Sequence, residues 1–327
     1  MPASFKAAFA INARDKEKHV ARAVLGALQQ TYPCHILLSD QGSTDRTYEV
    51  MEETVANFKM PMVKVPKVPE ADIVLDREFD EIPLHKVELL RCPIKGKYGM
   101  DSGNAHMTWL VDQTDAEWFV QCSADDYSLP ERVRVCMIAA EQNPCSCVAT
   151  TVYFTNPGEE VGPHAPRSGY PLESGYVNAG QGLFKMAYGS TIHAWRRDWL
   201  KKVGDAGPVT ADVFYGYLAA LDKGFYVVAD PQHVHVAHAD LNNMGFQGKM
   251  RAAEIAGDQA TINRINELNR FQLFELYLKT AERAQQLYPM AHDADKNAII
   301  NMLIQQACGW YAERKKLHAA GITPEIM

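Results

Sequence analysis

Residues 5–45 read FKAAFAINARDKEKHVARAVLGALQQTYPCHILLSDQGSTD. The apolar run Phe5–Ile11 predicts a strand, and Lys16–Gln30 repeats its apolar residues with helical spacing on one face. The residues 31–33, Thr-Tyr-Pro, end that helix, and His35–Ser39 predicts a second strand. A strand, a helix and a strand in this order predict the opening of a parallel α/β sheet.

The same alternation continues to about residue 240. Further strands are expected at 87–92, 118–122, 147–154, 225–229 and 234–237, and helices over 102–111 and from Pro130. Prolines break residues 58–84 into an insertion or long loop, and the Gly- and Pro-rich segment 155–182 also indicates a loop. From residue 251 two helical patterns predict an α-helical C-terminal appendage. We therefore expect a domain over 1–245, with halves 1–130 and 131–245, and a helical region over 246–327.

The bulk composition excludes several classes of protein. The chain has 327 residues, 47% of them hydrophobic, and a formal net charge of -7, so it lacks the overall basic character of many nucleic-acid-binding proteins. No stretch approaches the roughly 20 apolar residues that span a bilayer. The first residues do not resemble a signal peptide, so a cytoplasmic location with seven reduced cysteines is expected.

Two polar turns follow predicted strands. Asp40 begins the turn Asp-Gln-Gly-Ser-Thr-Asp, and a carboxylate at the carboxyl end of a strand lies where open α/β sheets bind ligands. Ser123, Ala124, Asp125 and Asp126 end the apolar run from Trp118, and adjacent carboxylates there are costly unless they are neutralised. A bound Mn²⁺ or Mg²⁺ provides such neutralisation. The alternative for both segments is a polar turn that begins a helix.

Two segments of the second half carry weaker signals. Asp212 heads the amphipathic segment 213–221, where it is either a functional carboxylate or a first-turn residue that favours the helix macrodipole. His233, His235 and His238 include two residues at alternate strand positions, which are either metal ligands or ordinary core and surface histidines.

In this order the motifs resemble those of the family 2 glycosyltransferases. The segment Ile11–Glu17 resembles the family's first-strand motif, 30–33 matches its Gln-Thr-Tyr-Pro, and 36–47 matches its strand followed by Asp-Asp-Gly-Ser-Thr-Asp-x-Thr. Ser123–Asp126 resembles its Asp-x-Asp-Asp metal motif. The looser second half contains Trp195-Arg196-Arg197, Val203-Gly204, Asp212 and Gly224-Phe225. The resemblance covers about residues 5–240.

The resemblance implies a GT-A fold, a Rossmann-like, mostly parallel mixed sheet flanked by helices, and inverting transfer of a sugar from a nucleoside-diphosphate sugar. Asp212 corresponds to the catalytic base, Asp125 to the main Mn²⁺ or Mg²⁺ ligand, and His238 to a histidine beside the metal. The donor is expected to contact Ala13, Arg14, Asp15, Asp40, Gly42, Ser43, Asn104, Ser123 and Ala124. The acceptor stays open among a glycan, a lipid-linked sugar, a protein, a small molecule and a modified nucleic acid. The C-terminal helices are a candidate surface for self-association.

The chain departs from the family pattern at several positions. Asp15 and Gln41 replace an Asn and an Asp, Ser123 replaces the first acid of the metal motif, and Ala211 replaces the Glu before the expected base. The alternative is therefore a degenerate protein that binds a sugar nucleotide with little or no transferase activity. The Gln-x-x-Arg-Trp signature of processive synthases is missing, which favours a single transfer. A Gly-rich dinucleotide fingerprint and a P-loop are also missing.

Overall fold

The computed structural model describes residues 5–66, 79–94, 100–155, 173–177, 192–207, 209–236, 250, 253–289 and 294–319. The first half of the chain contains its expected strands and helices in the expected order, with an additional pair of strands before the strand expected at 87–92. The elements of this half are β1 (Ala7–Ala13), α1 (Val20–Leu28), β2 (Cys34–Asp40), α2 (Thr47–Asn57), β3 (Met62–Pro66), β4 (Phe79–Pro83), β5 (Lys86–Arg91), α3 (Met100–Val111), β6 (Trp118–Ser123) and β7 (Tyr127–Ser128).

The second half begins with α4 and ends with two long helices. Its elements are α4 (Arg132–Gln142), β8 (Cys147–Thr155), β9 (Gly175–Tyr176), β10 (His193–Arg196), α6 (Arg197–Val203), α7 (Ala211–Leu221), β11 (Phe225–Val236), α9 (Gln259–Leu287) and α10 (Ala294–Ala319). Both C-terminal helices confirm the helical pattern read from residue 251.

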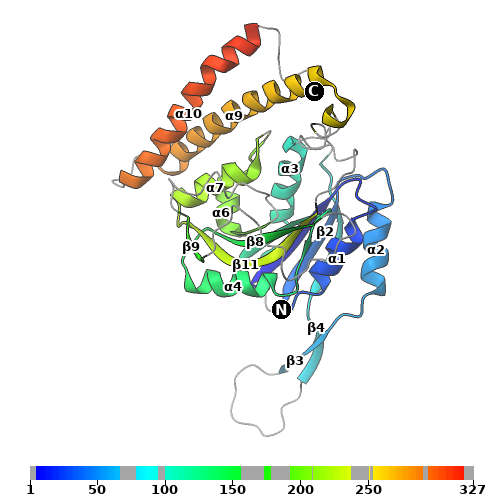
Figure 1. Cartoon of the computed structure of the whole chain (residues 1–327). Coiled ribbons are helices and arrows are strands. Elements are labelled where there is room, and N and C mark those ends of the chain that lie inside the picture. Colours follow the sequence, from blue (N-terminus) through cyan, green and yellow to red (C-terminus); the bar gives the residue numbers. More distant parts are fainter. Residues whose placement is uncertain are drawn as a thin grey trace.

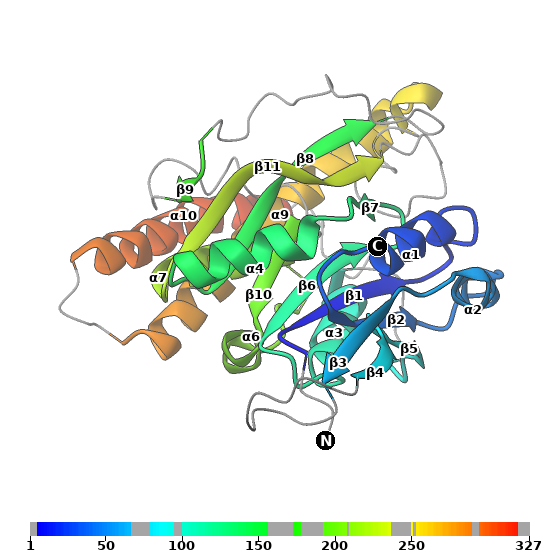
Figure 2. The same ribbon diagram turned by 90° about the horizontal axis from the view of Figure 1, so that it is seen from below.

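One mixed sheet forms the centre of the molecule, with strand order β5-β2-β1-β6-β10-β8-β11-β7 and β9 paired to β11 (Figure 2). Strands β5, β2, β1 and β6 are parallel to one another, and β8 is parallel to β11. The short strand β10 runs antiparallel between β6 and β8. The expected α/β architecture is confirmed.

The central strands are buried on both faces, as the burial of every residue of β2 and of all but one residue of β1 shows. Along β1 the side chains alternate: Phe9 and Ile11 pack with α1, α2 and α4 on one face, whereas Ala8 and Ala10 face the cluster that includes α3, α6 and α7. Figures 1 and 2 show these helices on opposite sides of the sheet. Alternation of this kind follows from the two-residue period of a strand.

The C-terminal helices pack on the same core as α6 and α7. Leu303 is fully buried, as is Ala284, and both belong to the hydrophobic cluster that also contains Trp195 and Tyr215. Helix α9 contacts α7, and α10 contacts α9 (Figure 1). The appendage expected from the sequence therefore shares its core with the second half of the sheet. The proposed boundary near residue 245 falls outside the described residues.

Several local expectations need correction. Helix α1 begins at Val20, because residues 16–19 form a turn in which the Lys16 carbonyl accepts hydrogen bonds from His19 and Val20. The segment 58–84 contains the antiparallel ribbon β3–β4, which projects from the body in Figure 1. The two strands expected after residue 224 are one irregular strand, β11, whose register shifts around Pro231. Of the loop expected over 155–182, the structure describes Thr155 and 173–177.

Most of the cysteines are buried thiols, as expected. Cys34, Cys122, Cys136, Cys145 and Cys147 are buried, whereas Cys308 is exposed. Burial raises the pKa of Cys122 to about 12, so this thiol stays protonated near neutral pH. Within the part of the chain that the structure describes, no helix combines the length and apolar character needed to cross a membrane.

Candidate functional site

The carboxyl ends of β1, β2 and β6 meet at one edge of the sheet. Ala13 pairs with Asp40 across β1 and β2, and Asn12 pairs with Ser123 across β1 and β6. Because these strands are parallel neighbours, the turns that follow them emerge side by side. The sheet thus brings together the three segments that the sequence marked as donor-binding: Arg14–Asp15, Asp40–Ser43 and Ser123–Asp125.

The side chain of Asp40 stabilises the turn that it begins. Its side chain is 1% exposed and accepts hydrogen bonds from the backbone N–H of Gly42 at 3.1 Å, from that of Ser43 at 3.2 Å, and from the Ser43 hydroxyl. Gly42 has a φ of 65°, a conformation that glycine adopts without strain. The carboxylate therefore holds the turn closed, and its contact with a nucleotide stays a prediction.

The turns after β1 and β2 interlock through side chains. The Asp15 N–H donates to Ser43 Oγ at 2.9 Å, and Thr44 N–H donates back to Asp15 Oδ1 at 2.7 Å. These bonds support Asp15, which has a φ of 49° although it is not glycine. A residue held in such a sparsely populated conformation by two neighbours indicates a turn of defined shape.

The turn after β1 also bonds residues at the start of α2. Lys16 N–H donates to Thr47 Oγ1 at 2.6 Å, and Glu17 N–H donates to Asp45 Oδ2 at 3.1 Å. Burial alone raises the pKa of Asp45, but the hydrogen bonds from Thr47 and Glu17 outweigh it, so the net pKa is lowered. Asp45 therefore stays ionised and ties the two turns together.

The two adjacent carboxylates at the end of β6 have different environments. Asp125 is partly exposed and accepts a hydrogen bond from the Lys16 ammonium, with an Nζ–Oδ2 distance of 2.7 Å. Asp126 is 3% exposed, and the fully buried guanidinium of Arg132 lies near enough to interact with its charge. The Lys16 ammonium therefore pairs with one of the two carboxylates that the sequence suggested for a metal ion, and the charge of the other, Asp126, acts on the buried Arg132.

The buried side chain of Arg132 stabilises the turn at residues 123–128. Its guanidinium donates to the Gln121 carbonyl and to Ser128 Oγ, each at 2.8 Å. Burial lowers the pKa of Arg132, and the nearby charge of Asp126 opposes that effect. Gly26 of α1 allows β7 to approach, because a Cβ there would lie 2.8 Å from the Ser128 carbonyl oxygen. The turn at residues 123–128 is thus fixed from two sides.

The second-half candidates lie in a different setting. Asp212 is a half-buried residue in the first turn of α7. Asn104 of α3 is 8% exposed, and its Nδ2 donates to the carbonyls of Gly207 at 2.6 Å and Val209 at 2.8 Å. Asn104 therefore holds the loop before α7, and its predicted contact with the donor stays a prediction.

The expected histidine ligand is outside the described residues. His238 belongs to the segment 237–249, whereas the backbones of His233 and His235 lie in β11 opposite Val152 and Phe154. Within the described ranges, no group of three or more His, Cys, Asp or Glu residues could hold a metal ion.

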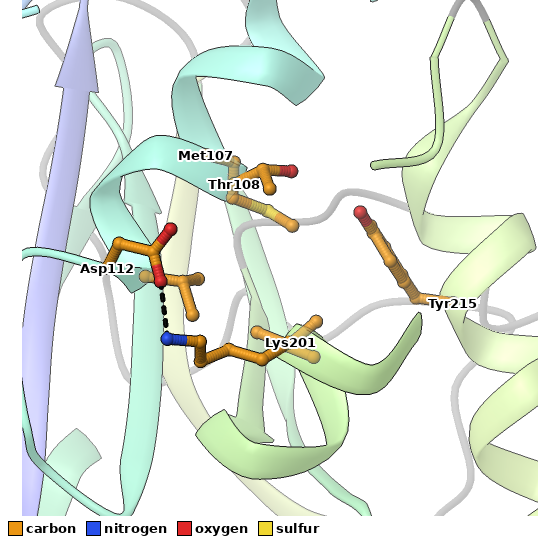
Figure 3. A pocket seen from close by; sticks show the side chains of 7 residues that line it. Met107, Thr108, Asp112, Lys201 and Tyr215 are labelled. Carbon is orange, nitrogen blue, oxygen red and sulfur yellow. Dashed lines mark ion pairs between the residues drawn. The ribbon is translucent and has the colours of Figure 1, made fainter. Parts of the chain in front are cut away.

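The cavity in Figure 3 lies elsewhere in the molecule, between α3, α6 and α7. Its volume is about 80 Å³, and its charged residues, Lys201 and Asp112, already form an ion pair with an Nζ–Oδ1 distance of 2.7 Å. Apolar and aromatic side chains such as Met107 and Tyr215 complete the lining. This cavity does not contain the predicted donor-binding residues, so the strand-end cluster remains the candidate site.

Two residues of the site were missed by the sequence reasoning. Lys16 directly follows the segment assigned to the donor, and a basic residue there was a usable signal once the strands were known to be neighbours. Arg132 gave no usable signal, because an arginine in the first turn of an amphipathic helix is ordinarily exposed.

No family model matches the chain, and a search of curated protein sequences also finds no match. Solved structures do resemble it. S. aureus TarS 1–349 in complex with UDP is 12% identical, with a TM-score of 0.53 over 97% of this chain and 92% of that one. The mannosyltransferase PcManGT from Pyrobaculum calidifontis, in complex with GDP-Man and Mn²⁺, is 10% identical, with a TM-score of 0.52 over 99% and 78%. At such identities the likeness establishes the fold, and it is the GT-A fold.

Proposed function

We propose that the chain is an inverting glycosyltransferase that moves one sugar from a nucleoside-diphosphate sugar to an acceptor hydroxyl. The observation that carries the proposal is the convergence of three polar turns, after β1, β2 and β6, at one edge of a GT-A sheet. Structures with this fold bind UDP, UDP-GlcNAc and GDP-Man in their own proteins. Fold alone does not assign chemistry, so the site residues must do so.

The donor's nucleotide is assigned to the interlocked turns after β1 and β2. Backbone groups around Ala13, Arg14 and Asp15 and the turn at Asp40, Gly42 and Ser43 form a preorganised surface, since their hydrogen bonds are already in place. A surface that is ordered before binding loses less conformational entropy on association. Ser123 and Ala124 lie beside it at the end of β6.

In this proposal, a single described carboxylate binds the divalent cation. Mg²⁺ and Mn²⁺ are commonly bound through one or two carboxylates plus phosphate oxygens and water. Asp125 is half-buried, with a side chain that is 20% exposed, whereas Asp126 is 3% exposed and lies near Arg132. Asp125 is therefore the described residue that we assign to the metal, with His238 as a further proposed ligand. When bound, such an ion supplies charge neutralisation for the departing diphosphate.

Asp212 is the proposed general base. Its carboxylate would accept the proton of the acceptor hydroxyl as that oxygen bonds to the anomeric carbon and the bond to the diphosphate oxygen breaks. General-base assistance is typically worth about 10²–10⁴-fold in rate. The bond between Asn104 and the preceding loop helps to position α7, on which this carboxylate is carried.

The second candidate is a protein that binds a sugar nucleotide without transferring it. The ion pair between Lys16 and Asp125 favours this alternative, because the proposed metal ligand already has a cation. Ala211, at the position of the family's Glu, favours it as well. Product formation with an acceptor distinguishes the two functions.

Binding is tested first, by isothermal titration with UDP, GDP, ADP, CDP and dTDP, with and without Mn²⁺. We expect at least one nucleotide to bind more tightly with Mn²⁺, and Asp125→Asn to abolish that metal dependence without lowering the melting temperature. Asp112→Asn is the matched control, since Asp112 also pairs with a lysine at 2.7 Å but lies at the cavity of Figure 3. Failure of every nucleotide to bind would contradict the proposal.

Transfer is tested next, with the sugar forms of the nucleotide that binds and a panel of glycan, lipid-linked, protein, small-molecule and nucleic-acid acceptors. A glycosylated product supports the transferase, and binding without any product supports the second candidate. Self-association through α9 and α10 is part of the proposal, and sedimentation of the full chain measures it.

A further inference from the structure

The ion pair between Lys16 and Asp125 joins two turns of the candidate site. It connects residues that are 109 positions apart in the chain, and the two side chains are 24% and 20% exposed. A pair that is this sheltered is screened less by salt than a pair on the open surface. The lysine ammonium therefore stands beside the carboxylate that we assign to a divalent cation.

The position of Lys16 is set by its backbone. Its N–H donates to Thr47 Oγ1 at 2.6 Å, and its carbonyl accepts from His19 and Val20, each at 2.9 Å. The preceding residue, Asp15, has a left-handed conformation that is held by Ser43 and Thr44. The base of the side chain is thus fixed, which distinguishes Lys16 from a lysine that meets a carboxylate by chance.

Lys16 is more readily displaced from the end of β6 than Arg132 is. Arg132 is fully buried beneath the turn and donates to Gln121 and Ser128, so it is part of the folded core. Lys16 is partly exposed and ends in a flexible four-carbon chain. A divalent ion that approaches Asp125 has to displace this ammonium or share the carboxylate with it.

We propose that Lys16 is the resident counter-cation of Asp125 and that it is displaced when the metal binds together with the donor's diphosphate. This inference rests on the proposed function and deepens it. A metal ion alone has to separate the ion pair and leaves the lysine without a partner. A nucleoside diphosphate gives the displaced ammonium a new anionic partner. Metal and nucleotide therefore bind cooperatively, and Lys16 carries part of the coupling between them.

Titration of the full chain with Mn²⁺ alone tests the displacement. We expect Lys16→Met to raise the affinity for Mn²⁺ about fivefold, because the metal no longer competes with a neighbouring ammonium. The control is Lys201→Met, which removes another lysine–aspartate pair of 2.7 Å, the one drawn in Figure 3. Its Mn²⁺ affinity should stay within twofold of the wild type, and melting temperatures of both variants confirm folding.

A double variant and a nucleotide complete the test. Lys16→Met combined with Asp125→Asn should lose the gain, which assigns it to this carboxylate. The increase in Mn²⁺ affinity caused by the nucleotide that binds should be smaller in Lys16→Met than in the wild type. Unchanged or weaker Mn²⁺ binding by Lys16→Met would overturn the inference while leaving the proposed function in place. Because Mn²⁺ is titrated alone, this result does not depend on whether any nucleotide binds.

Discussion

The N-terminal half of the sheet (β5, β2, β1 and β6) and the C-terminal half (β8 and β11) carry their candidate residues in different ways. In the first half, consecutive loops bind each other directly, as Asp15 binds Thr44 and Glu17 binds Asp45. In the second half, the loop before α7 is held by Asn104, which comes from α3 of the first half. The first site is therefore held by bonds between neighbouring turns of the same half, whereas the loop before α7 depends on a side chain from the other half.

The largest expected effect concerns Asp212 in the second half, whose role the sequence indicates less strongly. Asp212→Asn should lower turnover about 10²-fold or more with donor affinity near the wild type, because a general base is removed while the side-chain shape is kept. Steady-state kinetics with an acceptor that the panel under Proposed function yields and titration with the donor measure the two quantities.

Asp198 provides a matched control for this variant. It is also an acidic residue in the first turn of a helix, α6, and it has no role in the proposed transfer reaction. Asp198→Asn should leave turnover within a few-fold of the wild type. Near-normal turnover of Asp212→Asn would assign Asp212 to helix initiation and remove it from the site.

Asn104→Ala should break one of the links between the two halves. Two carbonyls, those of Gly207 and Val209, lose their donor, which is expected to cost about 2 kcal/mol in the free energy of unfolding. Nucleotide affinity should stay within twofold if Asn104 acts through the loop. Urea denaturation and titration with the nucleotide measure the two effects.

The comparable bond of Asn143 stays within one helix end, where its Nδ2 donates to the Ala139 carbonyl. Asn143→Ala should therefore cost less than Asn104→Ala. A large loss of nucleotide affinity in Asn104→Ala without a loss of stability would instead support the donor contact predicted from the sequence.

Gly26→Ala tests how tightly the first half is packed around the turn at residues 123–128. The added Cβ meets the backbone oxygen of Ser128 at 2.8 Å, so α1 or β7 has to shift, and we expect a loss of about 1–2 kcal/mol in unfolding free energy. Gly103→Ala is the control, since nothing lies within 4 Å of a Cβ there and the helix should gain up to about 1 kcal/mol. Equal stability of both variants would contradict the close packing.

The smallest expected effect is a loss of folding stability at acidic pH, caused by His106, which bonds the residue before Asp40. His106 of α3 bonds Ser39 through Nε2 at 2.7 Å, and burial lowers the pKa of His106 to about 4. The unfolded chain binds a proton near pH 6.5 and the folded chain does not, so stability is full above this pH and falls as the pH decreases toward 4. Between pH 6.5 and 5.5 the expected loss is about 1 kcal/mol.

Urea denaturation at several pH values checks this effect, with His106→Gln as the comparison. The variant should lose less stability over the same interval, and the remaining slope should come from His35 and His85, whose pKa values are also lowered mainly by burial. Acidic residues with lowered pKa values, such as Asp45 and Asp198, act below this interval. An unchanged slope in His106→Gln would contradict the prediction.

The sequence predicted the elements whose signal is local. The apolar run of β1, the helical spacing of α1 and the polar turn at Asp40 are visible within a few residues, and the structure confirms their positions to within a few residues. The structure also places the turns after β1, β2 and β6 side by side, because these strands are parallel neighbours in the sheet, whereas their contacts with a donor stay predictions.

The features that were missed depend on distant partners. Strand β10 has four residues, and it is a strand because β6 and β8 pair with both of its edges. The neutralisation of Asp125 requires knowing that Lys16, more than a hundred residues away in sequence, lies beside it. The roles of Asp212 and His238 depend on an acceptor and on a segment outside the described residues, so both stay predictions.

The antiparallel strand β10 has a mechanical consequence. In the described sheet it connects β6 to β8, so the strand pairing between these two strands passes through His193–Arg196. Trp195, 1% exposed, anchors this strand in the core against Trp199. A hinge motion of one half against the other has to break these bonds and open that core. The pairing of β10 with β6 and β8 and the packing of Trp195 therefore oppose a hinge motion between the two halves of the sheet.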